Sequence, residues 1–194
     1  MIPRPTLKTE RLVLRPFTLD DAKQVQKLAG DKQIASTTLN IPHPYEDGAA
    51  EEWIGTHEEI YQSGKGVTFA ITLKETGELV GAFSLLGIVE GHQGEIGYWV
   101  GVPYWNKGYC TEAGREVLRY GFMERGLNRI HARHISRNPT SGRVMEKLGM
   151  SHEGTRKQHI RKWEVFEDME LRGILRSEWM KQSGNNNVAS ASVK

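Results

Sequence analysis

The residues GEIGYWVGVPYWNKGYCTEA, numbers 94–113, join an alternating strand to a helix through a turn that contains glycine. The spacing of apolar residues predicts the strand over 95–100 and the helix over 111–125. Gly108 and the small Cys110 allow the backbone of the turn to approach a ligand closely, and the start of a helix presents unpaired N–H groups. The stretch therefore predicts a cradle for a pyrophosphate, although a glycine at such a place is also common as a simple turn residue.

The rest of the chain surrounds this centre with further strand and helix patterns. Strands are predicted over 11–17, 67–73, 79–86, 129–136, 150–160 and 164–175. Helices are predicted from Thr18 to Gly30, over 47–62, and from the cap Asn138 to Gly149, whereas segment 31–44 reads as irregular. The order β-α-α-β-β-β-α-β-α-β-β predicts an α/β (α+β) fold, with a mixed, mostly antiparallel sheet and helices on both faces.

Length and composition indicate one globular domain. The 194 residues are 38% hydrophobic and 26% charged, which is typical of a compact domain. We expect that domain over 1–180, followed by a polar tail over 181–194 with little to bury. No apolar run approaches the roughly 18 residues of a membrane span, the N-terminus lacks a signal peptide, and the single cysteine cannot form an intramolecular disulfide. A cytoplasmic protein without a membrane partner is therefore expected.

Charge is unevenly distributed along the chain. The net charge of +2 is too small to drive nucleic-acid binding, so no direct nucleic-acid partner is expected. Arginines and Lys147 make the region 115–147 basic, whereas 46–59 is acidic. A basic region suits a phosphate-bearing cofactor, and a solvated helix face is an equally reasonable interpretation.

Several familiar chemistries lack sequence support. The stretch that begins at Gly101 lacks the second glycine and the Ser/Thr of a phosphate-binding loop. His131 and His134 are three apart on a predicted strand and face opposite ways, so they cannot share a zinc ion, and we expect no metal site. Cys110 has no nearby histidine and GxSxG is absent, so an acyl-enzyme is not expected.

Five segments resemble the GNAT acetyltransferases, and in particular their ribosomal-protein N-terminal acetyltransferase branch. They are TERLVLRPF (9–17), GEIGYWVGVPYWNKGYCTEA (94–113), NPTSGRVMEKLGM (138–150), EGTRK (153–157) and DMELRGILRSEW (168–179). Their order and spacing cover nearly the whole chain except the tail. The resemblance implies transfer of an acetyl group from acetyl-CoA to a primary amine.

The resemblance also implies where acetyl-CoA binds. Backbone groups of Trp99, Val100 and Gly101 are expected to hold the pantetheine arm, and Arg143 to reach a cofactor phosphate. The pyrophosphate loop is expected to comprise Trp105, Asn106, Lys107, Gly108, Tyr109, Cys110 and Thr111. The family loop is usually Gln/Arg-x-x-Gly-x-Gly/Ala, so only its glycine matches strictly. The departures are tolerable if main-chain N–H groups bind the phosphates.

Attack on a thioester requires a neutral amine and a proton for the leaving thiolate. Glu95 is the candidate base, because on an alternating strand it shares a face with Gly97 and Trp99, and a solvent-facing edge carboxylate is the alternative. Ser141 shares its predicted helix face with apolar residues, so its hydroxyl is expected to point inward and to need a partner.

Other site assignments rest on the resemblance. It implies that Ser141 serves the thiolate and that Asn138 contacts the pantetheine arm, with helix capping as the alternative for both. Many relatives carry a tyrosine where this chain has Arg172, so a phenolic acid at that position is replaced by Ser141 or is absent.

The expected reaction is direct transfer to a protein N-terminal α-amine. An α-amine has a pKa of about 7.7–8.0 and a lysine about 10.4, so a water-mediated base suits the α-amine better. The alternatives are acetylation of a polyamine, amino acid or aminoglycoside, and a CoA-binding sensor without turnover. Either a monomer or a homodimer is compatible with the sequence.

Overall fold

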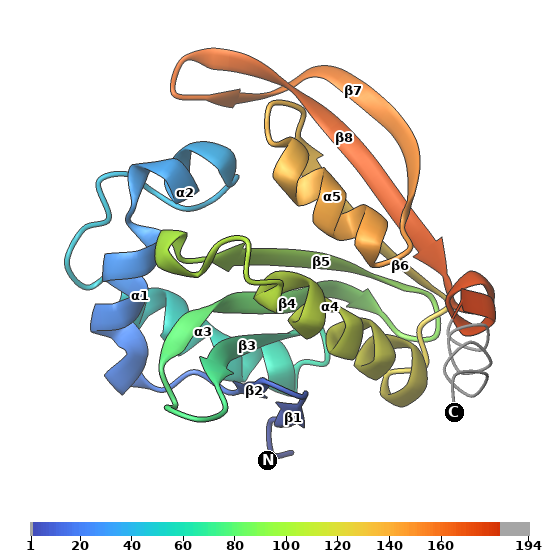
Figure 1. Cartoon of the computed structure of the whole chain (residues 1–194), viewed down its shortest axis with the longest axis horizontal. Coiled ribbons are helices and arrows are strands. Elements are labelled where there is room, and N and C mark those ends of the chain that lie inside the picture. The colour runs from blue at the N-terminus through green and yellow to red at the C-terminus, as the bar shows by residue number, and fades with distance from the viewer. Residues whose placement is uncertain (1, 183–194) are drawn as a thin grey trace.

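The computed structural model describes residues 2–182, and its framework is one eight-stranded sheet (Figure 1). The strand order is β1-β2-β3-β4-β5-β6-β8-β7. The strands are β1 (Leu7–Lys8), β2 (Leu12–Arg15), β3 (Gly66–Leu73), β4 (Leu79–Val89), β5 (Gln93–Val100), β6 (Arg129–Ile135), β7 (Ser151–Lys162) and β8 (Val165–Leu175). The helices are α1 (Ala22–Ala29), α2 (Lys32–Thr37), α3 (Ala49–Gln62), α4 (Tyr109–Arg119) and α5 (Pro139–Lys147), with short segments η1 (Leu19–Asp21), η2 (Val102–Tyr104) and η3 (Tyr120–Glu124). The predicted fold class is confirmed.

Two apolar cores lie on opposite faces of this sheet, because successive strand side chains alternate in direction. In β3 and β4, Phe69 and Phe83 belong to the core that α4 and α5 complete. Ala70 and Ala82 belong to the other core, which α1 and α3 complete. Helices therefore cover both faces, as the alternation predicts.

β5 and β6 form the parallel pair of the sheet, and they remain paired over only three residues. Gln93, Gly94 and Glu95 pair with 129–131 of β6. Beyond Glu95, β5 keeps β4 as its partner up to Val100, while β6 keeps β8. The sheet therefore opens between β5 and β6, and Figure 1 shows its two halves diverging there.

The long β7–β8 hairpin reaches across to the connection between α2 and α3 (Figure 1). Lys162 Nζ donates to the carbonyl oxygens of Leu39 at 3.4 Å and Ile41 at 3.2 Å. Arg137, which follows β6, donates through Nη2 to the Ser36 carbonyl oxygen at 2.5 Å. These contacts fix the α2–α3 connection against the second half of the sheet.

Three local predictions need correction. Segment 31–44 is not wholly irregular, because α2 forms there and the Asp31 side chain caps it by accepting from the Gln33 N–H at 2.8 Å. The two-residue strand β1 precedes the predicted order and pairs with β2. The central helix begins at Tyr109 rather than Thr111, because Gly108 adopts a left-handed conformation (φ 80°) as its N-cap.

The described chain ends in helical residues 176–182. The polar tail predicted over 181–194 lies almost entirely outside the described residues. No helix between residues 2 and 182 combines the length and the apolar character that a membrane crossing requires.

Candidate active site

The opening between β5 and β6 holds a cleft of about 910 Å³. It is lined by β4, β5, β6, the α2–α3 connection, the turn before α4, and α5. Tyr98 packs with the core of α4 and α5, whereas Trp99 packs with the core of α1 and α3. Glu95 and Gly97 share the face of Trp99, since strand residues alternate. Side chains from both faces line the cleft, so it runs through the sheet.

The turn 105–111 closes one end of the cleft and leads directly into α4. Asn106 and Gly108 both have positive φ values, 60° and 80°. The first intrahelical hydrogen bond is donated by the N–H of Glu112 to the Gly108 carbonyl oxygen at 3.0 Å. The N–H groups of residues 109–111 precede that bond and have no intrahelical acceptor. Together with the positive end of the helix dipole, they fit a phosphate group.

A carboxylate on α4 ties this turn to the start of β2. Glu112 accepts from Thr9 Oγ1 at 2.6 Å, from the Arg11 N–H at 2.8 Å and from Arg11 Nε at 2.7 Å. Burial opposes ionisation, but the hydrogen bonds from Thr9 and Arg11 hold the pKa of Glu112 below its ordinary value. Arg11 also donates to the Lys107 carbonyl oxygen at 3.0 Å and lies over the Tyr109 ring at 4.9 Å. The turn is thereby held in place before any ligand binds.

At two of the three predicted pantetheine positions, Val100 and Gly101, a backbone group is already hydrogen-bonded within the protein. Trp105 Nε1 donates to the Val100 carbonyl oxygen at 2.6 Å, and the Gly101 N–H donates to the Val80 carbonyl oxygen at 2.9 Å. Between residue 96 and Trp99, β5 pairs with β4 alone. The edge of β5 that faces the cleft therefore presents its backbone groups to a ligand in this range.

Ser141 points inward as predicted, and its partner is Tyr98. The Tyr98 hydroxyl donates to the Ser141 carbonyl oxygen at 2.9 Å and lies 2.9 Å from Ser141 Oγ. The Tyr98 ring stacks on Phe83 with centroids 5.0 Å apart. Burial raises the pKa of Tyr98, so this phenol stays protonated at neutral pH. Sequence reasoning missed Tyr98, although the period of two places it opposite the face of Glu95.

Cys110 lies at the start of α4 and packs against the same core. Burial raises the pKa of its thiol. A neutral thiol is a poor nucleophile.

Glu95 lies in the cleft wall on the face of α1 and α3, and it is not alone there. Arg133 Nε lies 2.8 Å from Glu95 Oε1, and both side chains are partly exposed. His131 is the register partner of Glu95 on β6, and burial lowers the pKa of that histidine. A carboxylate, a guanidinium and a neutral imidazole thus meet at the point where β5 and β6 part.

Asn138 and Arg143 lie at the α5 side of the cleft. Asn138 Oδ1 accepts from the Ser141 N–H at 3.2 Å, and Nδ2 is 3.5 Å from the Thr37 carbonyl oxygen. The helix-capping interpretation therefore describes this geometry. Arg143 is exposed and donates to Thr140 Oγ1 at 2.8 Å, which leaves its guanidinium within the cleft wall.

Arg172 lies under α5 on β8. Its Nη2 is 2.7 Å from Glu146 Oε1, and it lies close to Gly142 and the buried His134. Its positive charge partly offsets the effect of burial on the pKa of Tyr98. Tyr98 supplies a phenol to the cleft from β5, whereas Arg172 lies on β8.

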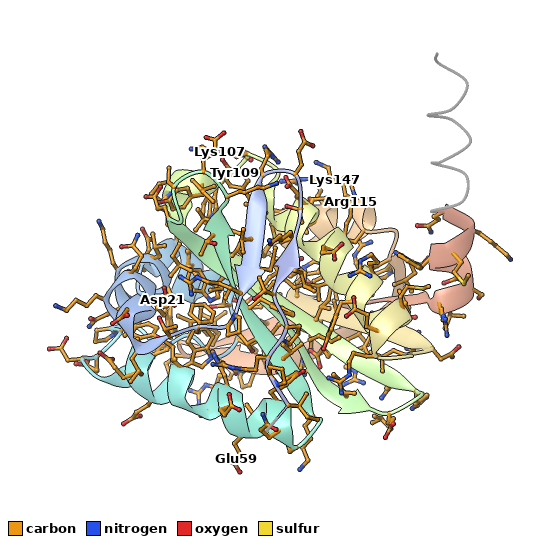
Figure 2. All side chains as sticks on the ribbon, turned by 90° about the horizontal axis from the view of Figure 1, so that it is seen from below. Asp21, Glu59, Lys107, Tyr109, Arg115 and Lys147 are labelled. Atoms are coloured by element: carbon orange, nitrogen blue, oxygen red, sulfur yellow. The ribbon has the colours of Figure 1, made fainter. Side chains whose placement is uncertain are left out.

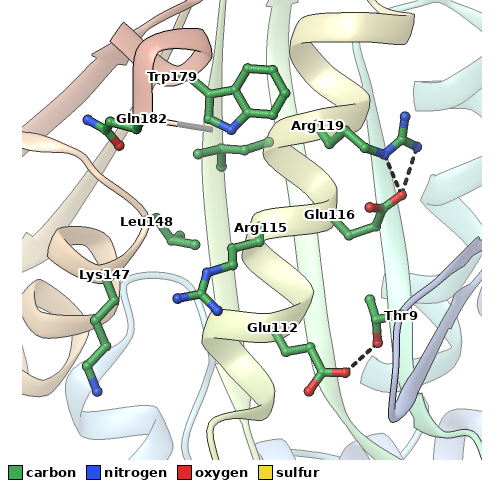
Figure 3. Close-up of a pocket in the computed structure, with 10 residues that line it drawn as sticks. Thr9, Glu112, Arg115, Glu116, Arg119, Lys147, Leu148, Trp179 and Gln182 are labelled. Atoms are coloured by element: carbon green, nitrogen blue, oxygen red, sulfur yellow. Dashed lines mark hydrogen bonds and ion pairs between the residues drawn. The ribbon is translucent and has the colours of Figure 1, made fainter. Parts of the chain in front are cut away.

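A smaller groove of about 480 Å³ between α4 and α5 continues the basic side of the cleft. Figure 3 shows Arg115 projecting from α4 toward α5, which carries Lys147. Lys147 lines both hollows. Figure 2 shows Lys107, Tyr109, Arg115 and Lys147 on one side of the molecule and Glu59 on the opposite side. Two residues of the basic region, Arg115 and Lys147, thus lie on the same side of the molecule as the turn that precedes α4.

Among the described residues, no group of three or more His, Cys, Asp or Glu side chains is placed to hold a metal ion. His134 is packed under α5 against Gly142, whereas His131 lies beside Glu95. The two histidines therefore face opposite ways, as the strand period predicts.

Comparison with known proteins agrees with this geometry. The acetyltransferase (GNAT) domain matches residues 11–151, and the chain belongs to the GNAT acetyltransferase family. Similar relatives are the N-acetyltransferase YnaD of Bacillus subtilis, 31% identical over 89% of this chain and 98% of its own length, and the [ribosomal protein uS5]-alanine N-acetyltransferase of Escherichia coli, 24% identical over 92% and 94%. A GNAT-family acetyltransferase of Bacillus anthracis has a similar crystal structure, with a TM-score of 0.79, 30% identity, and coverage of 89% of this chain and 99% of its own. The chain is thus an N-acetyltransferase, and acetyl-CoA is its acetyl donor.

Proposed function

We propose that the chain transfers the acetyl group of acetyl-CoA directly to a protein N-terminal α-amine, such as that of a ribosomal protein. The observation that carries this proposal is the cleft that runs through the sheet at Glu95, with helix N–H donors on one face and a carboxylate on the other. Two substrates approaching from opposite faces meet there without a covalent enzyme intermediate. The uS5-alanine acetyltransferase among the relatives supports a protein acceptor. The single cysteine is consistent with a cytoplasmic reaction.

The residues present fit acetyl-CoA, which supplies the thioester that the amine attacks. The N–H groups of residues 109–111 are assigned to the pyrophosphate. The cleft-facing edge of β5 up to Trp99 is assigned to the pantetheine arm. The remaining phosphate charge is assigned to three basic residues that line the cleft or the smaller groove near this turn: Arg115, Arg143 and Lys147.

The proton path has its two ends on different faces of β5. Glu95 accepts the amine proton, directly or through a water, and Arg133 holds its carboxylate in the cleft. On the other face, the Ser141 hydroxyl lies next to that of Tyr98 and donates toward the leaving thiolate. Asn138 positions Ser141 by capping its helix. The chain therefore has an acid and a base without using Cys110.

An acceptor screen with acetyl-CoA tests this function. Peptides that begin with Ala or Ser should release CoA thiol and carry the acetyl group on the α-nitrogen, as shown by fragment-ion mass spectrometry. The matched control is each peptide with a blocked N-terminus and an internal lysine, which should not react. Turnover of polyamines or aminoglycosides in preference to every peptide would contradict the proposal. Tight acetyl-CoA binding without release of thiol in the presence of any amine would instead support the alternative of a CoA-binding sensor without turnover.

A further inference from the structure

The acceptor half of the cleft lies on the face of β5 that carries Glu95, Gly97 and Trp99. Its walls are the α2–α3 connection, the exposed end of β4 at Leu86, and the outer side chains of β6 and the turn after it. Lys162 holds the α2–α3 connection in place, and Arg137 holds the end of α2. Folded elements therefore hold the side chains that would surround an incoming amine. The charges of these side chains can be compared with the charge of the acceptor.

Carboxylates on this wall are already neutralised. Among the described residues that line the cleft, Glu95 is the only acidic one. Arg133 pairs with it at 2.8 Å. Glu167, just behind the wall, is buried and pairs with Arg137. An acceptor with a second ammonium group would find no free carboxylate here and would meet two guanidinium groups.

On this side of the cleft, the lining contains two arginines, Arg133 and Arg137, and one carboxylate, Glu95. Arg133 contacts Glu95 through Nε, and its side chain is 40% exposed and lines the cleft. Arg137 is 42% exposed and also lines the cleft. Lys162 lies behind the wall, where its Nζ donates to the carbonyl oxygens of Leu39 and Ile41, two residues that line the cleft. The planar fork of an arginine matches a carboxylate better than any other common group.

We propose that the preferred acceptor is an α-amine followed by a carboxylate side chain within the first few residues, and that Arg133, beside Arg137, binds that carboxylate. The inference rests on the proposed function and names its substrate class as acidic N-termini. An apolar first side chain fits the same wall, because Leu86, Trp53 and Trp99 lie on it.

Three peptides that differ only at the second residue, Ala-Glu, Ala-Gln and Ala-Lys, provide the test. We expect kcat/KM to fall in that order, with about a tenfold difference between Glu and Lys, which corresponds to about 1.4 kcal/mol. Added salt should narrow the difference, because the contact is partly exposed. Equal values for Glu and Lys, or a preference for Lys, would overturn the proposal.

Arg133→Gln sharpens the test, because it removes the guanidinium and leaves Glu95 unpaired. The preference should then shift toward the Lys peptide, while the affinity for acetyl-CoA stays unchanged. Lys23→Gln is the matched control, since Lys23 is exposed on α1 and is not part of the cleft wall. It should keep the original order of the three peptides. An unchanged Glu-over-Lys ratio in Arg133→Gln would assign the effect to another residue and overturn the role of Arg133.

Free glutamate and spermidine complete the panel and separate this inference from the proposed function. If peptides react without charge preference, the inference fails and the N-terminal acetyltransferase stands. If free glutamate reacts and no peptide does, the protein acceptor fails while the preference for an anionic amine stands. Spermidine reacting faster than every anionic acceptor would refute the inference.

Discussion

Gly108→Val is the substitution that probes the turn before α4 most sharply. Gly108 has φ +80°, a left-handed conformation that costs other L-residues about 1–2 kcal/mol. A Cβ added there lies 3.4 Å from Nη2 of Arg11, so a branched side chain adds bulk beside Arg11 at the start of α4. We expect a loss of about 1–2 kcal/mol in stability. Acetyl-CoA affinity should fall at least about tenfold, since one hydrogen bond to a charged group contributes about 1.5–3 kcal/mol.

Calorimetric titration with acetyl-CoA, together with denaturant unfolding, separates the two effects. Gly91→Val is the matched control, because Gly91 has φ +66° and no described atom lies within 4 Å of an added Cβ. It should lose similar stability, at the other end of β5, and keep its affinity. Lys107→Ala should cost little, because the turn is expected to bind through its backbone. A folded Gly108→Val protein with the original affinity would refute the assignment of this turn to the pyrophosphate.

Other predictions concern the nucleophile, the proton path and acid stability. Cys110→Ala should retain most turnover, and mass spectrometry should find no acetyl-cysteine; loss of activity with a trapped acetyl group on Cys110 would reverse this. Glu95→Gln should lower turnover by about 10²- to 10⁴-fold, with part of the rate returning at high pH, whereas Ser141→Ala should lower it similarly at every pH. If Glu95→Gln follows the original pH–rate profile at full rate, Glu95 is a bystander. Burial lowers the pKa of His57 from 6.5 to about 4. Between these two pH values, the unfolded chain therefore binds a proton at His57 that the folded chain does not bind. The free energy of unfolding should therefore fall by up to about 3 kcal/mol as the pH drops from 6.5 to 4. His57→Phe should flatten this dependence, and urea unfolding curves with the same pH slope in both proteins would contradict it.

The fold was largely predictable because its main elements carry local signals. β3 and β4 are runs of mostly apolar residues that are buried on both faces, β5 alternates, and α4 shows an apolar stripe. α2 was not predicted, because it has only six residues and includes Ser36 and Thr37, which are weak helix formers. Their hydroxyl groups donate to carbonyl oxygens of the same turn. The start of α4 was not predicted correctly, because it depends on the left-handed backbone conformation of Gly108, which the sequence pattern does not reveal.

The candidate site was only partly predictable, because its contacts join distant segments. The shared face of Glu95 and Trp99 follows from strand geometry alone. The Tyr98–Ser141 pair depends on how α5 packs against β5, across 43 positions of sequence. The Arg133–Glu95 pair depends on the parallel register of β5 and β6. Such contacts follow from the strand order, which local patterns do not contain.

A crystal structure with CoA and an N-acetylated peptide product bound together tests the central claim most directly. The account predicts that the thiol lies beside Tyr98 and Ser141, and that the acetylated nitrogen lies beside Glu95 on the opposite face of β5. The two molecules should meet in the gap where β5 and β6 separate. A complex in which both ligands enter from the same face, or in which the gap stays closed to the pantetheine arm, would contradict the account.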